Sequence, residues 1–205
     1  IGLLMAYFGG TYTGGNRGLA DISIFSGVAV MGGAMLRDFA IVSTAFGADT
    51  RALKQAGWAG ALSVVIGVVL SFLVGALVAM AFGYTDAVSI TTIGAGAATY
   101  IVGPVTGTAL GASSEVIALS VGAGLVKSVL VMIGTPLVAK SIGLDNPYSA
   151  MVYGGLMGTT SGVAGGLAAT DPKLVPYGAM TATFYTGVGC LLAPSLLFFL
   201  VRLAV

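Results

Sequence analysis

The chain has 205 residues, of which 57% are hydrophobic and 7% charged, and its mean hydropathy is +1.05. Soluble domains carry about 25% charged residues, so this composition indicates an integral membrane protein. A formal net charge of +1 gives no basic surface for nucleic acid, and the lack of histidine beside a single cysteine, Cys190, excludes disulfides, Cys/His nucleophile pairs and zinc clusters within the chain.

The N-terminal part alternates apolar runs with polar connectors. The chain opens inside an apolar run with no basic segment before it, so we identify no signal peptide and expect the natural protein to begin earlier. Asp21 stands in the position of a helix N-cap before an apolar run from Ile22 to Phe46. Gly47 to Gly57 is predicted to be a polar connector, and Trp58 beyond it an interfacial anchor.

Three later segments are long and apolar enough to cross a hydrocarbon core about 30 Å thick as helices. They are Ala59 to Phe82, Val116 to Ala139 and Leu174 to Leu203. Short polar turns, one with Asp86 and one from Lys140 to Pro147, separate them from glycine-rich sequence. We therefore predict an all-α integral membrane protein, a multi-span helical transporter.

Two stretches rich in glycine, alanine, serine and threonine, Gly94 to Glu115 and Gly154 to Asp171, each end on a carboxylate. Glycine and Pro104 disfavour a continuous helix, and interrupted backbone inside a bilayer survives only where it is buried in protein or lines a cavity. We predict that each stretch forms a broken or re-entrant hairpin. The alternative is close packing of ordinary helices through small residues.

The basic residues suggest an orientation. The positive-inside tendency places Arg51, Lys54, Lys140 and Lys173 in the cytoplasm, against Arg17 and Arg202 outside. The two stretches then enter from opposite sides, as in an inverted repeat, and Thr106 to Glu115 aligns with Ser161 to Asp171 if one insertion is allowed. We expect residues 1–205 to form a single membrane transport domain, with residues 1–82 as scaffold or interface and residues 83–205 as the hairpin-containing substrate-binding part.

Two cationic residues lie within apolar runs. Lys127 is about 16 Å into its span, too deep for easy snorkelling, and intramembrane ionisable residues are candidates for function. An ion pair with Glu115 or Asp38 is the structural alternative for Lys127. Arg37 has a guanidinium that suits carboxylates, although it lies near enough to Phe46 to snorkel to the interface.

Candidate site residues are these cations and the polar residues of the two glycine-rich stretches. The predicted substrate-binding residues are Lys127, Arg37, Gly103, Thr106, Gly107, Thr159, Thr160, Ser161 and Gly162. The predicted ion-binding residues, which offer hard oxygen ligands, are Thr108, Ser113, Ser114, Glu115, Thr170 and Asp171. Both acids also fit the role of helix N-caps, and backbone carbonyls freed by the breaks are equally suited to hold an ion. Tyr100 and Tyr185 are expected to be interfacial or packed.

The sequence contains no nucleotide loop, metal motif or nucleophile with a base, so we expect neither an enzyme nor a cofactor beyond a coupling ion. The residues alone indicate an ion-coupled transporter of a small anion that works by alternating access, with substrate held between the two hairpins. Alternatives are a membrane sodium-translocating subunit of a decarboxylase complex, proton-coupled uptake of another small carboxylate, and a non-transporting scaffold. A channel is disfavoured because no ring of charge is visible.

Long runs over almost the whole chain resemble the M subunit of the bacterial malonate/sodium symporter, the MadM family. They are MGGAMLRDFAIVSTAFG (Met31 to Gly47), DAVSITTIGAGAATYIVGPVTG (Asp86 to Gly107), GASSEVIALSVGAGLVKSVLVMIGTP (Gly111 to Pro136), GLDNP (Gly143 to Pro147) and GGLMGTTSGVAGGLAATDPKLVPYGAMTATFYTG (Gly154 to Gly187). The resemblance implies uptake of malonate by symport with sodium across the bacterial cell inner membrane. It also implies a partner, the small membrane L subunit, in addition to membrane lipid, and it leaves a higher oligomer open. It assigns no site residues.

Overall fold

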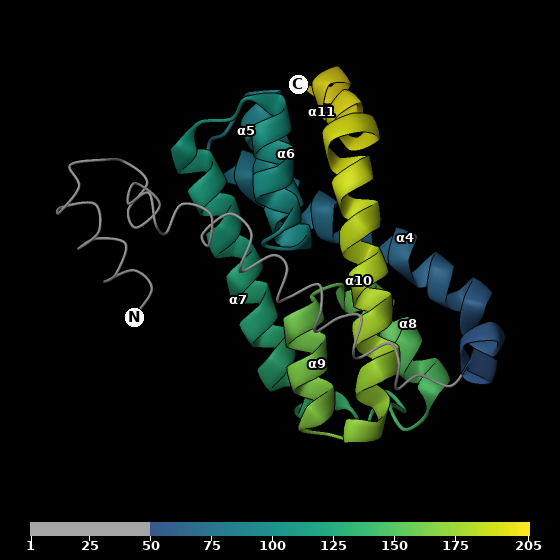
Figure 1. Ribbon diagram of the computed structural model, residues 1–205. Coiled ribbons are helices and arrows are strands. Elements are labelled where there is room, and N and C mark those ends of the chain that lie inside the picture. Colours follow the sequence, from purple (N-terminus) through teal and green to yellow (C-terminus); the bar gives the residue numbers. More distant parts are fainter. Residues whose placement is uncertain (1–49) are drawn as a thin grey trace, which may run out of the picture. The chain divides into compact units, whose positions relative to one another are not determined.

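The computed structural model describes residues 50–205, with side chains from Gly57 onward, and all of these belong to one unit of the fold. Arg37 and the other residues before position 50 lie outside the described part. Every regular element described is a helix (Figure 1). In chain order they are α4 (Thr50–Ala81), α5 (Ala87–Ala98), α6 (Val102–Leu110), α7 (Ser114–Val138), α8 (Pro147–Met157), α9 (Thr160–Ala168), the 3₁₀ turn η3 (Pro172–Leu174), α10 (Val175–Leu192), the π-helical segment η4 (Ala193–Leu197) and α11 (Phe198–Ala204).

Within the described residues, three helical segments are long and apolar enough to cross a membrane. They are Gly57–Ala81, Ser114–Val138 and Pro172–Ala204, with mean hydropathies of 2.8, 2.3 and 2.0. Large apolar side chains on their outer faces are exposed, among them Leu77 at 63% and Leu137 at 78%. A surface of this kind is suited to hydrocarbon. The predicted all-α membrane fold and its three spans are confirmed.

The first of these helices corrects one prediction. Gly47 to Gly57 was expected to be a polar connector, but α4 begins at Thr50 and continues through Gly57 to Ala81. The segment RALKQA after Thr50 consists of residues with high helix propensity, so its polarity does not interrupt the helix. Trp58 lies in the third turn and is 78% exposed.

The stretch after α4 divides into two short helices, α5 and α6. Asp86 caps α5 by accepting from the Ser89 N–H at 2.8 Å, a bond that lowers the pKa of this carboxyl. The chain leaves the helix at Thr99, which is extended (φ −154°, ψ 155°). The Thr99 hydroxyl accepts from the N–H groups of Ile101 and Val102 and so caps α6. Pro104, expected to disrupt the helix, lies instead in the first turn of α6, where a missing N–H is tolerated.

Helices α5 and α6 lie side by side and run in opposite directions. A β-carbon on Gly103 would lie 2.9 Å from the Cα of Gly96, and one on Gly107 would lie 2.8 Å from the methyl group of Thr92. The contacting positions run from Gly96 back to Thr92 on α5 and from Gly103 forward to Gly107 on α6, as expected for an antiparallel pair. Small residues at these positions permit the close approach.

The second glycine-rich stretch also contains a break. Asn146 begins α8 with a reciprocal capping box to Ser149, and α8 ends at Gly158, which has φ +71°. A left-handed residue at this position is favoured by glycine because no β-carbon opposes it. Helix α9 starts two residues later, at Thr160. Figure 1 shows α5 and α6 at one end of the described unit and α8 and α9 at the other.

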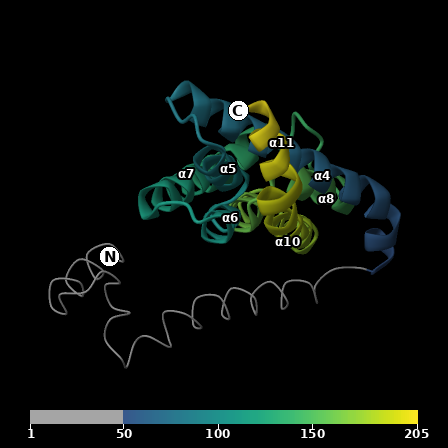
Figure 2. The ribbon, with the colours of Figure 1, turned by 90° about the horizontal axis from the view of Figure 1, so that it is seen from above.

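The longer helices hold these two short pairs. Helix α4 packs against α5 and α8, α7 against α5 and α9, and α10 against α8 and α9. In the view from above, α10 lies between α6 and α8 (Figure 2). Backbones approach closely at glycine pairs, since a β-carbon on Gly67 would meet the Gly155 carbonyl and one on Gly154 would meet Gly178. Both breaks are consequently enclosed by spanning helices.

Candidate functional site

The side chain of Lys127, in the middle of α7, is directed into the protein at the first break. Its ammonium group lies 2.9 Å from the Ser71 hydroxyl of α4, 2.8 Å from the Ala98 carbonyl oxygen and 3.3 Å from the Tyr185 hydroxyl of α10. An ammonium group has three N–H donors, so all of them are used. Every one of these acceptors is neutral. Lys127 therefore has no ion pair to any described side chain.

The Ala98 carbonyl is a specific acceptor for a cation. Ala98 is the last residue of α5, and the last carbonyls of a helix lack intrahelical partners and carry the negative end of the helix dipole. The Lys127 ammonium therefore stabilises the interrupted end of α5. The sequence-based alternatives paired Lys127 with Glu115 or Asp38, but Glu115 is exposed in the first turn of α7 and Asp38 lies outside the described residues.

Tyr185 connects the two breaks. The ring is fully buried, its centroid is 5.1 Å from the Lys127 ammonium, and its hydroxyl donates to the Gly67 carbonyl of α4 at 3.2 Å. The face of the ring packs against Gly158, where any β-carbon would clash with the ring. One side chain thus touches the lysine at the first break and the left-handed residue at the second.

Helix α7 contacts both breaks within little more than one turn. Gly124 packs against the backbone of Tyr100 in the first break, and a β-carbon there would overlap the Tyr100 nitrogen. Ser128 forms a hydroxyl–hydroxyl hydrogen bond with Thr159 in the second break. Since Lys127 lies between these two positions, both interruptions meet at the middle of the same spanning helix.

The N-terminus of α9 lacks the side-chain cap that the N-terminus of α6 has. Thr159 is buried but makes no side-chain capping bond, whereas Thr99 caps α6. Unsatisfied N–H groups in the first turn of a helix, together with the helix dipole, favour negative charge. Gly162 in this turn packs against the Ser128 backbone, which keeps the turn beside α7.

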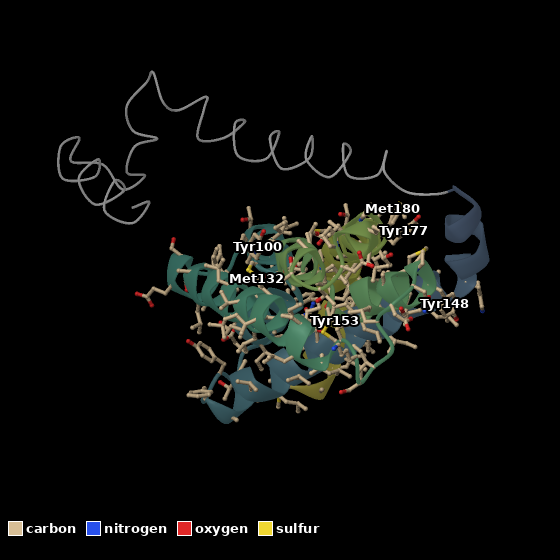
Figure 3. All side chains as sticks on the ribbon, turned by 90° about the horizontal axis from the view of Figure 1, so that it is seen from below. Tyr100, Met132, Tyr148, Tyr153, Tyr177 and Met180 are labelled. Carbon is tan, nitrogen blue, oxygen red and sulfur yellow. The ribbon has the colours of Figure 1, made fainter. Side chains whose placement is uncertain are left out.

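A cavity with a volume of about 1870 Å³ lies beside Lys127. It is lined mainly by residues of α4, α7 and α8, together with Ile93 and Ala97 of α5. Most of its wall is apolar, and its polar groups are few. Lys127 and Ser71 form one polar group, and the Thr135 hydroxyl with the Tyr153 hydroxyl 2.7 Å away forms another. Figure 3 labels Tyr153 in the interior and Tyr148 at the start of the same helix. Because the rest of the wall is apolar, only the polar side chains of this cavity suit a small charged ligand.

The structure separates the predicted substrate-binding residues into groups. Lys127, Thr159, Thr160, Ser161 and Gly162 lie at or next to the meeting of the breaks, whereas Gly103 and Gly107 serve the contact between α5, α6 and α7. Thr106 is buried in α6 and its hydroxyl has no hydrogen-bond partner. Arg37 is outside the described residues. Binding of substrate by these residues stays a prediction.

The predicted ion-binding residues lie at helix junctions away from the breaks. Ser113 caps α7 by accepting from the Val116 N–H, and Thr170 donates to the Gly166 carbonyl. Asp171 caps η3 through the Lys173 N–H, so the capping alternative holds for this acid. Thr108, Ser114 and Glu115 are exposed near the α6–α7 junction. Their role as ion ligands stays a prediction.

Three residues around Lys127 were not predicted from sequence. Ser71 and Ser128 lie in mostly apolar spans, and a hydroxyl group in such a span was the available signal. Tyr185 was expected to be interfacial or packed; it is packed, but its hydroxyl also serves Lys127 and Gly67. No sequence feature of Tyr185 distinguishes it from the other tyrosines.

Comparison with known proteins agrees with these features. A family model described as "Malonate/sodium symporter MadM subunit" matches residues 1–205, which is the entire chain. The searches of curated proteins and of solved structures gave no significant match.

Proposed function

The chain belongs to the malonate/sodium symporter MadM subunit family, and from this premise we propose that it is the subunit that binds malonate and moves it through the membrane. The family is one of transporter subunits and not of enzymes. The observation that carries the proposal is the position of Lys127, a half-buried basic residue with only neutral partners where two helix breaks meet. A cation of this kind, next to an uncapped helix N-terminus, suits a small dianion.

We propose that one malonate carboxylate replaces a hydroxyl as an acceptor for Lys127. A hydrogen bond between two charged groups is about twice as strong as one between neutral groups, so exchange of the Ser71 or Tyr185 hydroxyl for a carboxylate is favourable. The second carboxylate is assigned to the first turn of α9, from Thr160 to Gly162. The carboxylates would thereby join α7 to the second break.

We further propose that α5 with α6, and α8 with α9, are re-entrant hairpins of an inverted repeat. Their placement at opposite ends of the described unit supports this assignment, as does their convergence on α7 (Figure 1). In transporters built this way, substrate binds near the midplane where discontinuous helices meet, and one part moves against the other. Residues 83–205 are then the substrate-binding part and residues 1–82 the scaffold or interface.

Sodium coupling, implied by the family name, follows the energetics of uptake. Moving a dianion into a negatively polarised cell costs about 2.3 kcal/mol per charge per 100 mV. Co-transported cations must compensate for this cost. We assign the protein to the bacterial inner membrane, in a complex with the small L subunit. The family name, which calls the protein a subunit, supports a partner of this kind.

Uptake by reconstituted vesicles tests this proposal. The protein, purified with its partner subunits, should accumulate labelled malonate when an inward sodium gradient is imposed, without any soluble enzyme. A potassium gradient of equal size is the control. No sodium-driven accumulation with all subunits present would refute the symporter and favour a subunit of an energy-coupled decarboxylase. Accumulation driven only by a proton gradient would refute sodium coupling.

A further inference from the structure

Two threonine hydroxyls in the first helix pair are buried without a hydrogen-bond partner. They are Oγ1 of Thr91 on α5 and Oγ1 of Thr106 on α6, and both residues are 0% exposed. Buried side-chain oxygens are nearly always hydrogen-bonded, so an unpartnered pair needs an explanation. Thr92, equally buried next to Thr91, donates to the Val88 carbonyl at 2.8 Å and shows how an ordinary helical threonine is satisfied.

The two hydroxyls lie on the same side of the helix pair. Thr92 and Gly107 face each other across the antiparallel contact, and Thr91 and Thr106 are each one residue earlier. One residue turns a helix by about 100°. Because the helices run in opposite directions, these equal steps rotate both side chains away from the contact toward the same side.

That side packs against the last span. On α5, Thr91 shares a helix face with Ala95 and Ala98, and on α6, Thr106 lies one turn after Val102. Ala95, Ala98 and Val102 belong to one buried cluster with Tyr185, Ala193 and Leu197 of the last span, and Val102 packs on Gly189 of α10. Both helices of the pair also contact η4 directly.

The segment of the last span at this place is the π-helical η4. The Phe198 N–H donates a hydrogen bond to the carbonyl of Ala193, five residues earlier, which is the pattern of a π-helix. A π-helical turn moves carbonyl oxygens out of the regular helical pattern, and such turns are frequent at functional sites. The side of the helix pair that carries the two unpartnered hydroxyls therefore contacts an irregular turn of backbone.

The chemistry of this arrangement selects a small hard monovalent cation. Hydroxyl and carbonyl oxygens are hard neutral ligands. Divalent cations in proteins usually also receive carboxylates, and the described residues contain no group of three or more His, Cys, Asp or Glu side chains able to hold a metal.

We propose that Thr91 and Thr106, together with backbone carbonyl oxygens of η4, bind the coupling sodium ion between the first helix pair and the last span. This inference rests on the sodium symport of the proposed function and locates the ion apart from the predicted acids Glu115 and Asp171. Bound sodium would join α5 and α6 to the span that carries Tyr185. Because the Tyr185 hydroxyl bonds the Lys127 ammonium, the ion would be linked to Lys127 through this span.

Threonine-to-valine substitution tests the site because it removes the hydroxyl and keeps the shape. In full-length protein with its partner subunits, Thr91→Val, Thr106→Val and the double variant should raise the sodium concentration for half-maximal malonate uptake by about 10- to 100-fold. Thr92→Val is the matched control, since its hydroxyl is already bonded within α5, and it should stay within about twofold of the unsubstituted protein.

A second readout does not depend on transport. Sodium, compared with potassium at equal ionic strength, should raise the Tm of the purified complex, and the double variant should lose this increase. Loss of an unpartnered hydroxyl should not lower the Tm in potassium. A lower Tm in potassium would therefore reveal misfolding separately from loss of sodium binding. Thr91→Ser, which keeps a hydroxyl, should retain the sodium effect.

The outcomes separate this inference from the proposed function. An unchanged sodium dependence in the double variant, or an equal loss in Thr92→Val, would overturn the sodium site while leaving the symporter intact. A double variant that unfolds in potassium would also overturn it, because the hydroxyls would then be structural. If the unsubstituted protein lacks sodium-driven uptake but shows a sodium-specific rise in Tm that requires both threonines, the symport proposal fails and the site stands.

Discussion

The ammonium group of Lys127 lies 2.8 Å from the carbonyl oxygen of Ala98, the last residue of α5. This bond places a cation from one spanning helix at the negative end of an interrupted helix. It satisfies a carbonyl that the break leaves without a helical partner, and it holds a charge inside the protein without an acidic partner among the described residues. The same interaction thus stabilises the break, and under the proposed function it leaves Lys127 available to an anionic ligand.

Removal of this charge should impair malonate binding more than folding. In Lys127→Gln the amide keeps N–H donors for the neutral acceptors, so the free energy of unfolding should change by no more than about 1 kcal/mol. A hydrogen bond to a charged group contributes about 1.5–3 kcal/mol, so the malonate concentration for half-maximal uptake should rise about 10- to 100-fold. Vesicle uptake and thermal unfolding measure the two effects.

Lys140→Gln is the matched control for this prediction. Lys140 follows α7 and is exposed, so the substitution removes the same charge from the chain without touching the centre. Its uptake should match that of the unsubstituted protein. Normal malonate affinity in Lys127→Gln would show that Lys127 only supports the break.

Tyr185→Phe should weaken the connection between the two breaks. The substitution keeps the ring against Gly158 but removes the hydroxyl that accepts from Lys127 and donates to Gly67. Loss of these two hydrogen bonds should lower the free energy of unfolding by about 1–3 kcal/mol, and malonate affinity should fall because Lys127 is less firmly held. The control is Tyr148→Phe, since Tyr148 is 51% exposed. Equal behaviour of the two variants would contradict the connecting role.

The spanning helices were predictable from sequence because length and hydropathy alone decide whether a helix crosses a bilayer. The connector before Trp58 was not, because helix propensity in RALKQA outweighs its polarity. Glycine and Pro104 predicted an interruption in the first glycine-rich stretch without giving its position, and the structure places it at Thr99. Thr99 caps the next helix with its own hydroxyl, an interaction that depends on local backbone geometry.

The centre was predictable only in part. Lys127 stood out because a lysine is rare in an apolar span, and Thr159 because it lies in a glycine-rich stretch. Tyr185 could not be found in this way, since its role depends on contacts with α4, α7 and Gly158 that are distant in sequence. Thr91 was likewise indistinguishable from Thr92 until hydrogen-bond partners could be assigned.

Gly158→Ala should be more damaging than the same change at another left-handed glycine. Gly158 has φ +71° and Gly143 has φ +65°, so alanine at either position strains the backbone by about 1–2 kcal/mol. Only Gly158 packs against a buried ring, whereas nothing lies within 4 Å of a β-carbon on Gly143. The clash with Tyr185 should add about 1–3 kcal/mol and reduce uptake. Equal losses of stability in the two variants, measured by thermal unfolding, would show that the contact between the second break and Tyr185 is loose.

Two glycines of α7 separate the packing of a break from the propensity of a helix. A β-carbon on Gly122 would meet nothing within 4 Å, so Gly122→Ala should stabilise the protein by up to about 1 kcal/mol through helix propensity. A β-carbon on Gly124 would overlap the backbone of Tyr100, so Gly124→Ala gains the same propensity but must push the first break away from Lys127. We expect Gly124→Ala to lower the free energy of unfolding by about 1–3 kcal/mol and to impair malonate uptake, while Gly122→Ala transports normally. Normal transport in both variants would mean that the position of the first break against α7 has no part in binding. If both substitutions stabilise the protein, the backbone of the first break moves away from residue 124 at little cost in free energy.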